Sequence, residues 1–213
     1  MAGKNHSYHE KRETGYVLQL RGLLADLPPY ARDYFRAVEQ KSSAKTRISY
    51  AYDLQVFLRF LLERNPALKD KSMRDITLKD LDCLTSLDIE EYQEYLKYYE
   101  SENGEQKNGA SSIARKMSSL RSFMDYFYKK EQLSKNVAMQ VDMPKLHEKA
   151  IIHLEPDEVA IFLDSLETYE KELTGKKKDF FLKTKVRDIA IVTLFLGTGI
   201  RVSECVGLDI NDV

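Results

Sequence analysis

The residues with the clearest chemical potential form a short turn near the end of the chain, Thr198-Gly199-Ile200-Arg201. An apolar run leads into this turn, so we expect one helix to end here and a short second helix to begin at Arg201. The first turn of a helix favours an anion over a cation, because its N–H groups are unpaired and carry partial positive charge. An arginine there predicts a phosphate clamp. The alternative is a joint between two core helices with an incidental exposed arginine.

Glu204 falls in the first turn of the same predicted short helix. Its carboxylate can orient the groups around Arg201, which would give it a role at the site. An acid in a first helical turn is equally favoured by the helix dipole alone. The sequence leaves both interpretations of Glu204 open.

A second candidate site lies on the helix expected from about residue 111 to 131. At 100° per residue its apolar side chains fall in one narrow stripe, and serines and long basic side chains occupy the other side. Such residues let a helix approach a phosphate backbone and hydrogen-bond to it. The alternative is a face that contacts only solvent, but such a face usually carries more acidic residues than this one. The residues predicted to contact DNA here are Ser111, Ser112, Arg115, Lys116, Ser119 and Ser122.

The helix expected from about residue 44 to 63, with Ser42 or Ser43 as its N-cap, changes character along its length. Its second half is apolar almost all round, whereas its first half is polar on most sides. We therefore expect one end to enter a core and the other to present polar groups. The residues predicted to contact DNA at the polar end are Lys45, Thr46, Arg47 and Tyr50.

The net charge of −1 gives no overall attraction to nucleic acid, but the charges are sorted into blocks. Residues 41–64 carry five basic and two acidic side chains, and residues 107–135 and 171–187 each carry seven basic and two acidic ones. Residues 65–106 are acidic, with eleven acids against five bases. Three basic blocks on a nearly neutral chain predict one basic face. Chance clustering on solvated helices is the alternative.

The composition, 43% hydrophobic and 31% charged, is typical of a globular protein. No stretch reaches the roughly 18 apolar residues of a membrane span, and the polar N-terminus is unlike a signal peptide, so we expect a cytoplasmic protein without membrane contact. Cys83 and Cys205 are far apart and are expected to be reduced, buried thiols. No residue cluster indicates a metal site, and we expect no cofactor and no small-molecule substrate.

Helical periodicity dominates, so the expected fold class is mainly α. After a disordered stretch over residues 1–12, helices are expected at about 17–27, 28–41, 44–63, 89–100, 111–131, 154–169, 184–197 and 201–206, with a short turn or helix at 78–87. Loops are expected at 102–109 and 172–179, and the entry to a strand at 208–213. The helix over 184–197 is apolar enough to be buried, but residues 154–213 alone are too few to cover it, so this part is expected to be poorly ordered or covered by a second copy.

The stretch from Thr198 to Leu208 resembles the first catalytic-arginine box of the tyrosine recombinases, the phage integrase family, and of its Xer-like members above all. Residues 43–54 and 112–123 resemble two stretches of that family's core-binding domain, and residues 136–145 resemble its linker. Each of these upstream matches is weak alone. Their order and spacing together carry the resemblance along most of the chain.

The resemblance implies four parts: an N-terminal arm over residues 1–27, a helical, SAM-like core-binding domain over 28–140, a linker over 141–153, and a truncated, mostly helical start of the catalytic domain over 154–213. It implies duplex DNA as the partner and self-association as a tetramer on paired sites. It assigns Arg201 to catalysis, and Glu204 matches the family's acidic residue at that spacing.

The family's other catalytic groups, including a nucleophilic tyrosine, find no match in these 213 residues. We therefore expect the chain to be the N-terminal part of a longer protein. By resemblance, that tyrosine would attack the phosphate and hold the strand as a 3′-phosphotyrosyl link, so that site-specific recombination needs neither ATP nor a metal. This part is expected to bind DNA without cutting it. A non-enzymatic DNA-binding or interaction protein, or an unrelated helical scaffold, are the alternatives.

Overall fold

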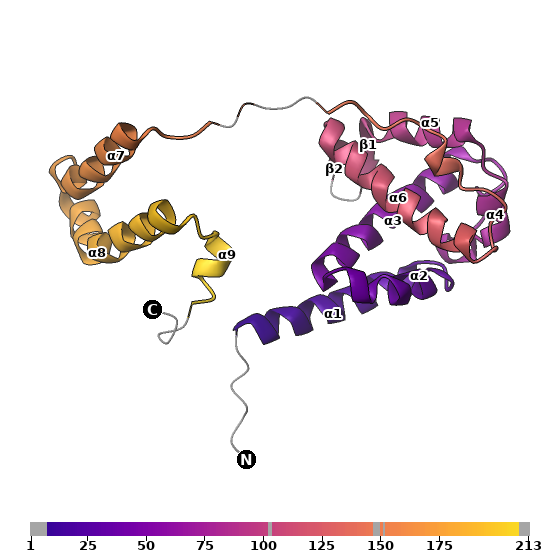
Figure 1. Cartoon of the computed structure of the whole chain (residues 1–213), viewed down its shortest axis with the longest axis horizontal. Coiled ribbons are helices and arrows are strands. Elements are labelled where there is room, and N and C mark those ends of the chain that lie inside the picture. Colours follow the sequence, from indigo (N-terminus) through magenta and orange to yellow (C-terminus); the bar gives the residue numbers. More distant parts are fainter. Residues whose placement is uncertain (1–7, 102–103, 147–149, 151, 209–213) are drawn as a thin grey trace, which may run out of the picture. The chain divides into compact units, whose positions relative to one another are not determined.

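The computed structural model describes residues 8–101, 104–146, 150 and 152–208 (Figure 1). Contacts divide the chain into two compact units, Met1–His147 and Glu148–Val213, each of which is described by itself. The sequence instead suggests boundaries at residues 27, 140 and 153.

The first unit is a helical bundle with one small hairpin. Its elements are α1 (Tyr8–Asp26), α2 (Ala31–Ala37), η1 (Glu39–Lys41), α3 (Ala44–Arg64), η2 (Met73–Asp75), α4 (Leu78–Asp82), α5 (Ser86–Tyr95), β1 (Tyr98–Ser101), β2 (Gly104–Lys107), α6 (Ala110–Lys129) and η3 (Val137–Met139). The second unit contains α7 (Pro156–Thr168), η4 (Tyr169–Lys171), α8 (Gly175–Thr198) and α9 (Val202–Cys205). The expected mainly α class is confirmed. No helix in the described ranges has the length and apolar character needed to cross a membrane.

Helix α3 is the centre of the first unit, and α1, α5 and α6 pack against it. Ser43 is its N-cap, because the hydroxyl of Ser43 accepts a hydrogen bond from the backbone N–H of Thr46 at 3.1 Å. The helix ends at Arg64, before Asn65-Pro66, as the proline predicts. Its second half is buried on several sides and its first half is partly exposed, which confirms the expected change of character.

Aromatic side chains fill much of the core around α3. Phe57 packs edge-on against Tyr92 of α5 with ring centroids 5.0 Å apart, and Tyr34 of α2 packs in the same way against Phe123 of α6 at 5.2 Å. Edge-to-face pairs of this kind add stability beyond the area they bury. The core therefore fixes α2, α5 and α6 around α3.

One carboxylate is buried in the contact between α3 and α6. Asp53 of α3 is 2% exposed, and its two oxygens accept hydrogen bonds from both terminal nitrogens of the Arg115 guanidinium. The ammonium group of Lys116 also contacts Asp53, at 3.2 Å. A buried charge is tolerated only when it is paired and hydrogen-bonded, and here two cations meet that requirement.

Helix α1 differs from the expectation for this region. It begins at Tyr8, where a disordered stretch was expected, and its Leu20, like Leu27 directly after the helix, belongs to the core of the first unit. The side chain of Gln19 donates a hydrogen bond to the Tyr52 hydroxyl of α3 at 3.2 Å. These contacts with α3 stabilise a helix that has only a weak apolar periodicity of its own.

The hairpin was missed by the sequence interpretation, which extended a helix to residue 100. Helix α5 ends at Tyr95, and β1 pairs antiparallel with β2, Tyr98 lying opposite Lys107. Gly104 has a φ of 90°, a conformation that glycine adopts readily, and Asn103-Gly104 is a strong hairpin signal in the sequence. The expected loop over 102–109 is therefore partly a strand.

The second unit differs from expectation at the start of α8. Helix α8 begins at Gly175, so the basic segment expected as a loop over 172–179 supplies its first turn. Within the described part of this unit no residue is buried, as expected for a stretch too short to cover the apolar helix over 184–197. Among the described residues, α7 and η4 make the main contacts with α8, which is too little structure to enclose it. The expected strand lies beyond the described residues, apart from Leu208.

Cys83 of the first unit was expected to be buried. It is exposed, and it is a free thiol.

The Asp53 contact predicts a specific stability loss. Asp53→Asn leaves Arg115 and Lys116 without their buried counter-charge, so we expect the free energy of unfolding to fall by about 3 kcal/mol. Asp125→Asn is the matched control, because Asp125 pairs only with the exposed Lys129 on the same helix and should cost at most about 0.5 kcal/mol. Urea unfolding followed by circular dichroism measures both. Equal losses would mean that Asp53 is no more important than a surface acid.

Burial of Tyr34 predicts that the free energy of unfolding falls at high pH. Burial raises the pKa of Tyr34 to about 12, against a lowering by its hydrogen bond to Ser122. Below pH 10 the phenol is protonated in both states, so the stability it contributes is fully present. Between pH 10 and about 12 only the unfolded chain loses this proton, which lowers stability by up to about 1.4 kcal/mol per pH unit. Tyr34→Phe should flatten this decline, whereas Tyr128→Phe, at an exposed site on α6, should not.

Candidate nucleic-acid interface

The outer side of α6 carries the predicted serine and basic face. Ser111, Ser112 and Arg115 are exposed, and Ser118, one turn after Arg115, extends the same face. The small serine side chains leave the backbone of α6 accessible between the longer ones. This part of the predicted face is therefore exposed to solvent.

Asp53 determines how Arg115 is presented. The pairing of two guanidinium nitrogens with one carboxylate fixes the plane of the guanidinium. The Arg115 side chain is still 48% exposed, whereas that of Asp53 is 1% exposed. The carboxylate is thus turned inward and the cation outward, at the junction of α3 and α6.

A polar stripe on α3 borders this junction, and the sequence interpretation found only its first member. Lys45, Ser49, Tyr52 and Arg59 recur at helical spacing, with the apolar Val56 between the last two, and all five are exposed or half-buried. Counting forward from Lys45 in steps of three and four residues would have identified the stripe. We name it, together with the exposed serines and Arg115 of α6, the α3–α6 face.

A polar pocket of about 280 Å³ opens on this face between α3, α6 and the hairpin. Its lining residues are Tyr52, Gln55, Val56, Arg59, Tyr99, Ser101, Gln106 and Lys116. Hydrogen-bonding amide and hydroxyl groups from three elements meet there beside two cations. The hairpin therefore contributes to the candidate interface, although it was expected to be a loop.

Two predicted contacts on α6 point inward. Ser119 is fully buried, and its hydroxyl has no hydrogen-bond partner, because it faces the packed side of the helix. Lys116 keeps only 11% of its side chain exposed, because its ammonium group is drawn to Asp53. Ser119 is therefore wrong as a DNA contact, and Lys116 reaches the surface only through the pocket.

Ser122 holds an intermediate position. It is half-buried, and its hydroxyl accepts a hydrogen bond from the Tyr34 hydroxyl of α2 at 3.0 Å. Ser122 thereby fixes α2 against α6, and direct contact with DNA remains a prediction for it.

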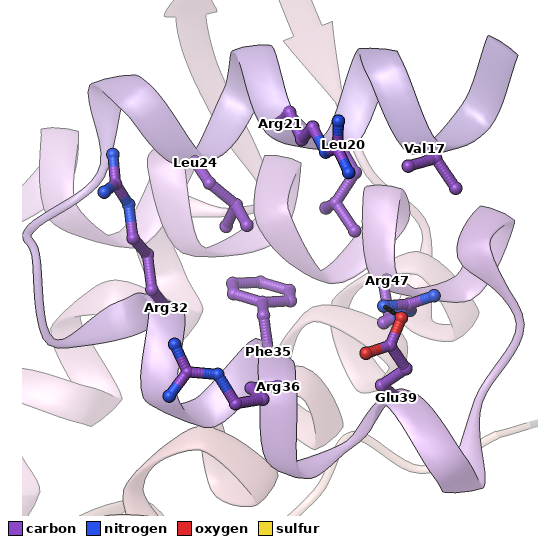
Figure 2. Close-up of a pocket in the computed structure, with 9 residues that line it drawn as sticks. All are labelled: Val17, Leu20, Arg21, Leu24, Arg32, Phe35, Arg36, Glu39 and Arg47. Atoms are coloured by element: carbon purple, nitrogen blue, oxygen red, sulfur yellow. Dashed lines mark hydrogen bonds and ion pairs between the residues drawn. The ribbon is translucent and has the colours of Figure 1, made fainter. Parts of the chain in front are cut away.

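Three predicted contacts at the start of α3 turn away from the stripe. The Arg47 guanidinium pairs with Glu39 at 2.8 Å and its side chain is 11% exposed, in a groove beside α1 and α2 (Figure 2). Tyr50 packs against the core, and Thr46 exchanges a hydrogen bond with the Ser43 hydroxyl at 2.9 Å. Of the four residues predicted here, Lys45 alone lies openly on the α3–α6 face.

Arg201 lies in the second unit, after a turn that matches the sequence prediction. Gly199 has a φ of 66°, the left-handed conformation that ends many helices, and its N–H bonds the Phe195 carbonyl at 2.9 Å. Arg201 follows as the N-cap residue of α9, with 81% of its side chain exposed. The guanidinium is therefore open to solvent beside a helix N-terminus, as a phosphate clamp requires.

Glu204 is bonded to Arg201 in two ways. One carboxylate oxygen accepts from the Arg201 backbone N–H at 2.9 Å, and the other contacts the Arg201 guanidinium at 3.2 Å. The backbone hydrogen bond, then the guanidinium, lowers the pKa of Glu204 below its ordinary value. Glu204 thus both caps the helix and orients Arg201, so the two interpretations of this residue are compatible. An exposed pair of this kind is weak enough to yield to a phosphate.

No group of three or more His, Cys, Asp or Glu side chains that could hold a metal occurs in the part of the chain that the structure describes. The candidate site groups are cationic. In the first unit they lie on the α3–α6 face, and in the second unit the exposed guanidinium of Arg201 lies at a helix N-terminus.

The chain matches known proteins in a consistent way. Residues 32–131 match the family model of the phage integrase N-terminal SAM-like domain. The chain is 35% identical over 185 residues to tyrosine recombinase XerC of Caldanaerobacter subterraneus subsp. tengcongensis, covering 85% of this chain and 47% of that protein. It is 30% identical over 207 residues to tyrosine recombinase XerS of Lactococcus lactis subsp. cremoris, covering 88% and 58%.

A tyrosine recombinase XerS of Streptococcus pyogenes is 31% identical over 209 residues, covering 89% of this chain and 58% of the relative. The chain thus spans about half the length of the relatives that it matches. No solved structure gives a significant match. The matched SAM-like domain and the similarity to XerC and XerS, which continues beyond that domain, support a Xer-like tyrosine recombinase.

Proposed function

We propose that the first unit binds duplex DNA through the α3–α6 face, as part of a site-specific recombinase. The observation that carries DNA binding is the arrangement at the junction, where Asp53 is buried and Arg115 is exposed beside a row of serines. A surface of this kind offers phosphates a fixed, planar donor and several hydroxyl donors, and the acid at the junction, Asp53, is buried beneath them. The names of the relatives support recombination as the reaction.

Arg201 is proposed to bind the phosphate at which the DNA strand is cut. Extra negative charge develops on the non-bridging oxygens in the transition state, and a guanidinium stabilises it by donating two hydrogen bonds while remaining charged at any relevant pH. Glu204 would hold Arg201 at the helix terminus until the phosphate arrives. The nucleophile would be a tyrosine outside these 213 residues, as the family resemblance implies.

The whole protein would act as a tetramer on paired duplex sites, without a cofactor, and the cytoplasm is the expected compartment. The 213-residue chain alone would bind DNA without cutting it, because it supplies one arginine of the catalytic set and no tyrosine in the family's context.

Binding through the α3–α6 face predicts a measurable salt effect. Each phosphate contact that is lost reduces the slope of log affinity against log salt by about 0.9. Lys45→Ala should therefore flatten the slope by about one unit in a fluorescence anisotropy titration with duplex DNA. Lys79→Ala, an exposed lysine on α4, is the matched control and should leave the slope unchanged. Lys45 is a cleaner probe than Arg115, whose removal also disturbs Asp53. An unchanged slope for Lys45→Ala would assign this lysine to a solvated face.

A nicked suicide substrate tests whether the 213-residue chain binds duplex DNA without cutting it. Such a duplex traps any covalent protein–DNA intermediate, which is then resolved on a denaturing gel. We expect the 213-residue chain to shift the duplex on a native gel and to give no covalent band. A covalent band would mean that one of the 13 tyrosines in this chain is a nucleophile, against the proposal. Absence of any shift would instead remove DNA binding and favour a helical scaffold.

A further inference from the structure

The two faces of the β1–β2 hairpin differ in charge. Tyr99 of β1 lies opposite Gln106 of β2, and Glu100 lies opposite Glu105. Successive residues of a strand point to opposite faces, and residues that lie opposite each other across two strands share a face. Tyr99 is 7% exposed and belongs to the core, so Gln106 lies on the face toward the bundle, whereas Glu100 and Glu105 are exposed on the other face. The face toward the bundle therefore carries no acid from these pairs.

Contacts with α5 fix the position of the hairpin. The ring of Tyr99 stacks on that of Tyr95, the last residue of α5, with ring centroids 5.2 Å apart. Directly after β2, the side chain of Asn108 donates a hydrogen bond to the Leu96 carbonyl at 2.8 Å. Each strand is thus tied to the bundle by its own contact. Gln106 is therefore presented from a fixed backbone, as selective recognition of a ligand requires.

Two glutamines in the polar pocket form few hydrogen bonds within the protein. Gln55 of α3 and Gln106 of β2 both line the pocket, and both are half-buried. Among the described residues, the Gln55 carboxamide has no hydrogen-bond partner, and that of Gln106 forms one hydrogen bond, of 3.4 Å, to the Gly104 carbonyl. A carboxamide carries two N–H donors and an acceptor oxygen. Both glutamines therefore keep donors and acceptors for a ligand that approaches the α3–α6 face.

This combination of donors and acceptors suits a base edge better than a phosphate. Phosphate oxygens only accept hydrogen bonds, so hydroxyl and cationic donors such as Ser112 and Arg115 suit them, and a glutamine oxygen would find no partner there. Adenine presents an acceptor, N7, beside a donor, the N6 amino group, in the major groove, and a glutamine side chain bonds both. The major groove also admits a two-stranded β-ribbon as well as an α-helix.

Phosphate donors flank the two glutamines. Arg59 of α3 and Lys116 of α6 line the same pocket. The Tyr52 hydroxyl, also in the lining, accepts its hydrogen bond from Gln19, so its own proton can be donated to a phosphate oxygen. Phosphate contacts fix the register of a protein on the duplex, whereas base contacts select the sequence. The pocket thus supplies both kinds of contact side by side.

We propose that the hairpin is a sequence-reading element and that Gln106 and Gln55 determine specificity. The open side of the pocket faces the major groove, where each carboxamide hydrogen-bonds N6 and N7 of one adenine, in two neighbouring base pairs. Arg115 and the serines of α6 bind the phosphates beside them. The inference rests on the proposed binding of duplex DNA through the α3–α6 face, and it adds which residues select the sequence.

Selection from a pool of duplexes with randomised sequence tests this assignment. The wild-type 213-residue chain should enrich adenine at two neighbouring positions. Gln106→Val keeps a good strand former but removes the amide, so it should lower the adenine preference at one position by about fivefold or more, and Gln55→Ala should do so at the other. Gln106→Glu should exchange adenine for cytosine at the first position, because a carboxylate accepts from the N4 amino group of cytosine.

Matched controls separate base reading from phosphate binding. Gln132→Ala, at an exposed glutamine after α6, should leave every sequence preference unchanged. Gln106→Val and Gln55→Ala should keep the wild-type slope of log affinity against log salt, because a neutral side chain neutralises no phosphate. Lys45→Ala should show the reverse, a flatter slope with unchanged preference. Circular dichroism should give the wild-type helix content for every variant.

Several outcomes overturn the proposal. If the Gln106 and Gln55 variants select the same sequences as the wild-type chain, these side chains contact no base. A wild-type chain that binds duplex DNA without any preference also contradicts the inference, while the proposed DNA binding stands. Equal loss of preference at every position in Gln106→Val would give Gln106 a structural role instead. If the wild-type chain binds no duplex, the proposed function itself fails, and sequence reading by the hairpin fails with it.

Discussion

A buried carboxylate joins the two helices on which the candidate interface is built. Asp53 lies in the contact between α3 and α6, and a lone charge there would be costly, so the bundle is stable only if cations reach it. Arg115 and Lys116, adjacent residues on α6, supply those cations from two directions. The pairing sets the rotation of α6 about its axis, because both side chains can reach one carboxylate only from one orientation. The serine face is presented outward as a result.

The pairing with Asp53 also separates polar residues of α6 that the sequence pattern alone places on one face. Adjacent residues on α6 project about 100° apart, so Arg115 remains half exposed while Lys116 is drawn inward. Ser118 and Ser119 divide in the same way between surface and core. The interface is thus narrower than the run of polar residues suggests, and its cations hold fixed positions.

The two units place their cations under different physical conditions. In the first unit the aromatic core and Asp53 position the α3–α6 face, which we propose as the DNA-binding surface. In the second unit the described residues form no buried core, and Arg201 is held locally, by a left-handed glycine on one side and Glu204 on the other. Local positioning of this kind depends on backbone geometry and one carboxylate, so the turn keeps its form with little packing around it.

The sequence by itself determined the features that depend on neighbouring residues: a serine cap at the start of α3, the stop at Pro66, the apolar stripe of α6, and the turn that presents Arg201. Long-range contacts decided the rest. The length of α1 depends on packing against α3, the hairpin on cross-strand pairing, and the inward turn of Arg47 on Glu39. Asp53 meets Arg115 across 62 positions of chain, a separation that carries no local signal. Periodicity can assign a residue to a side of a helix, but only the packed structure decides which sides meet.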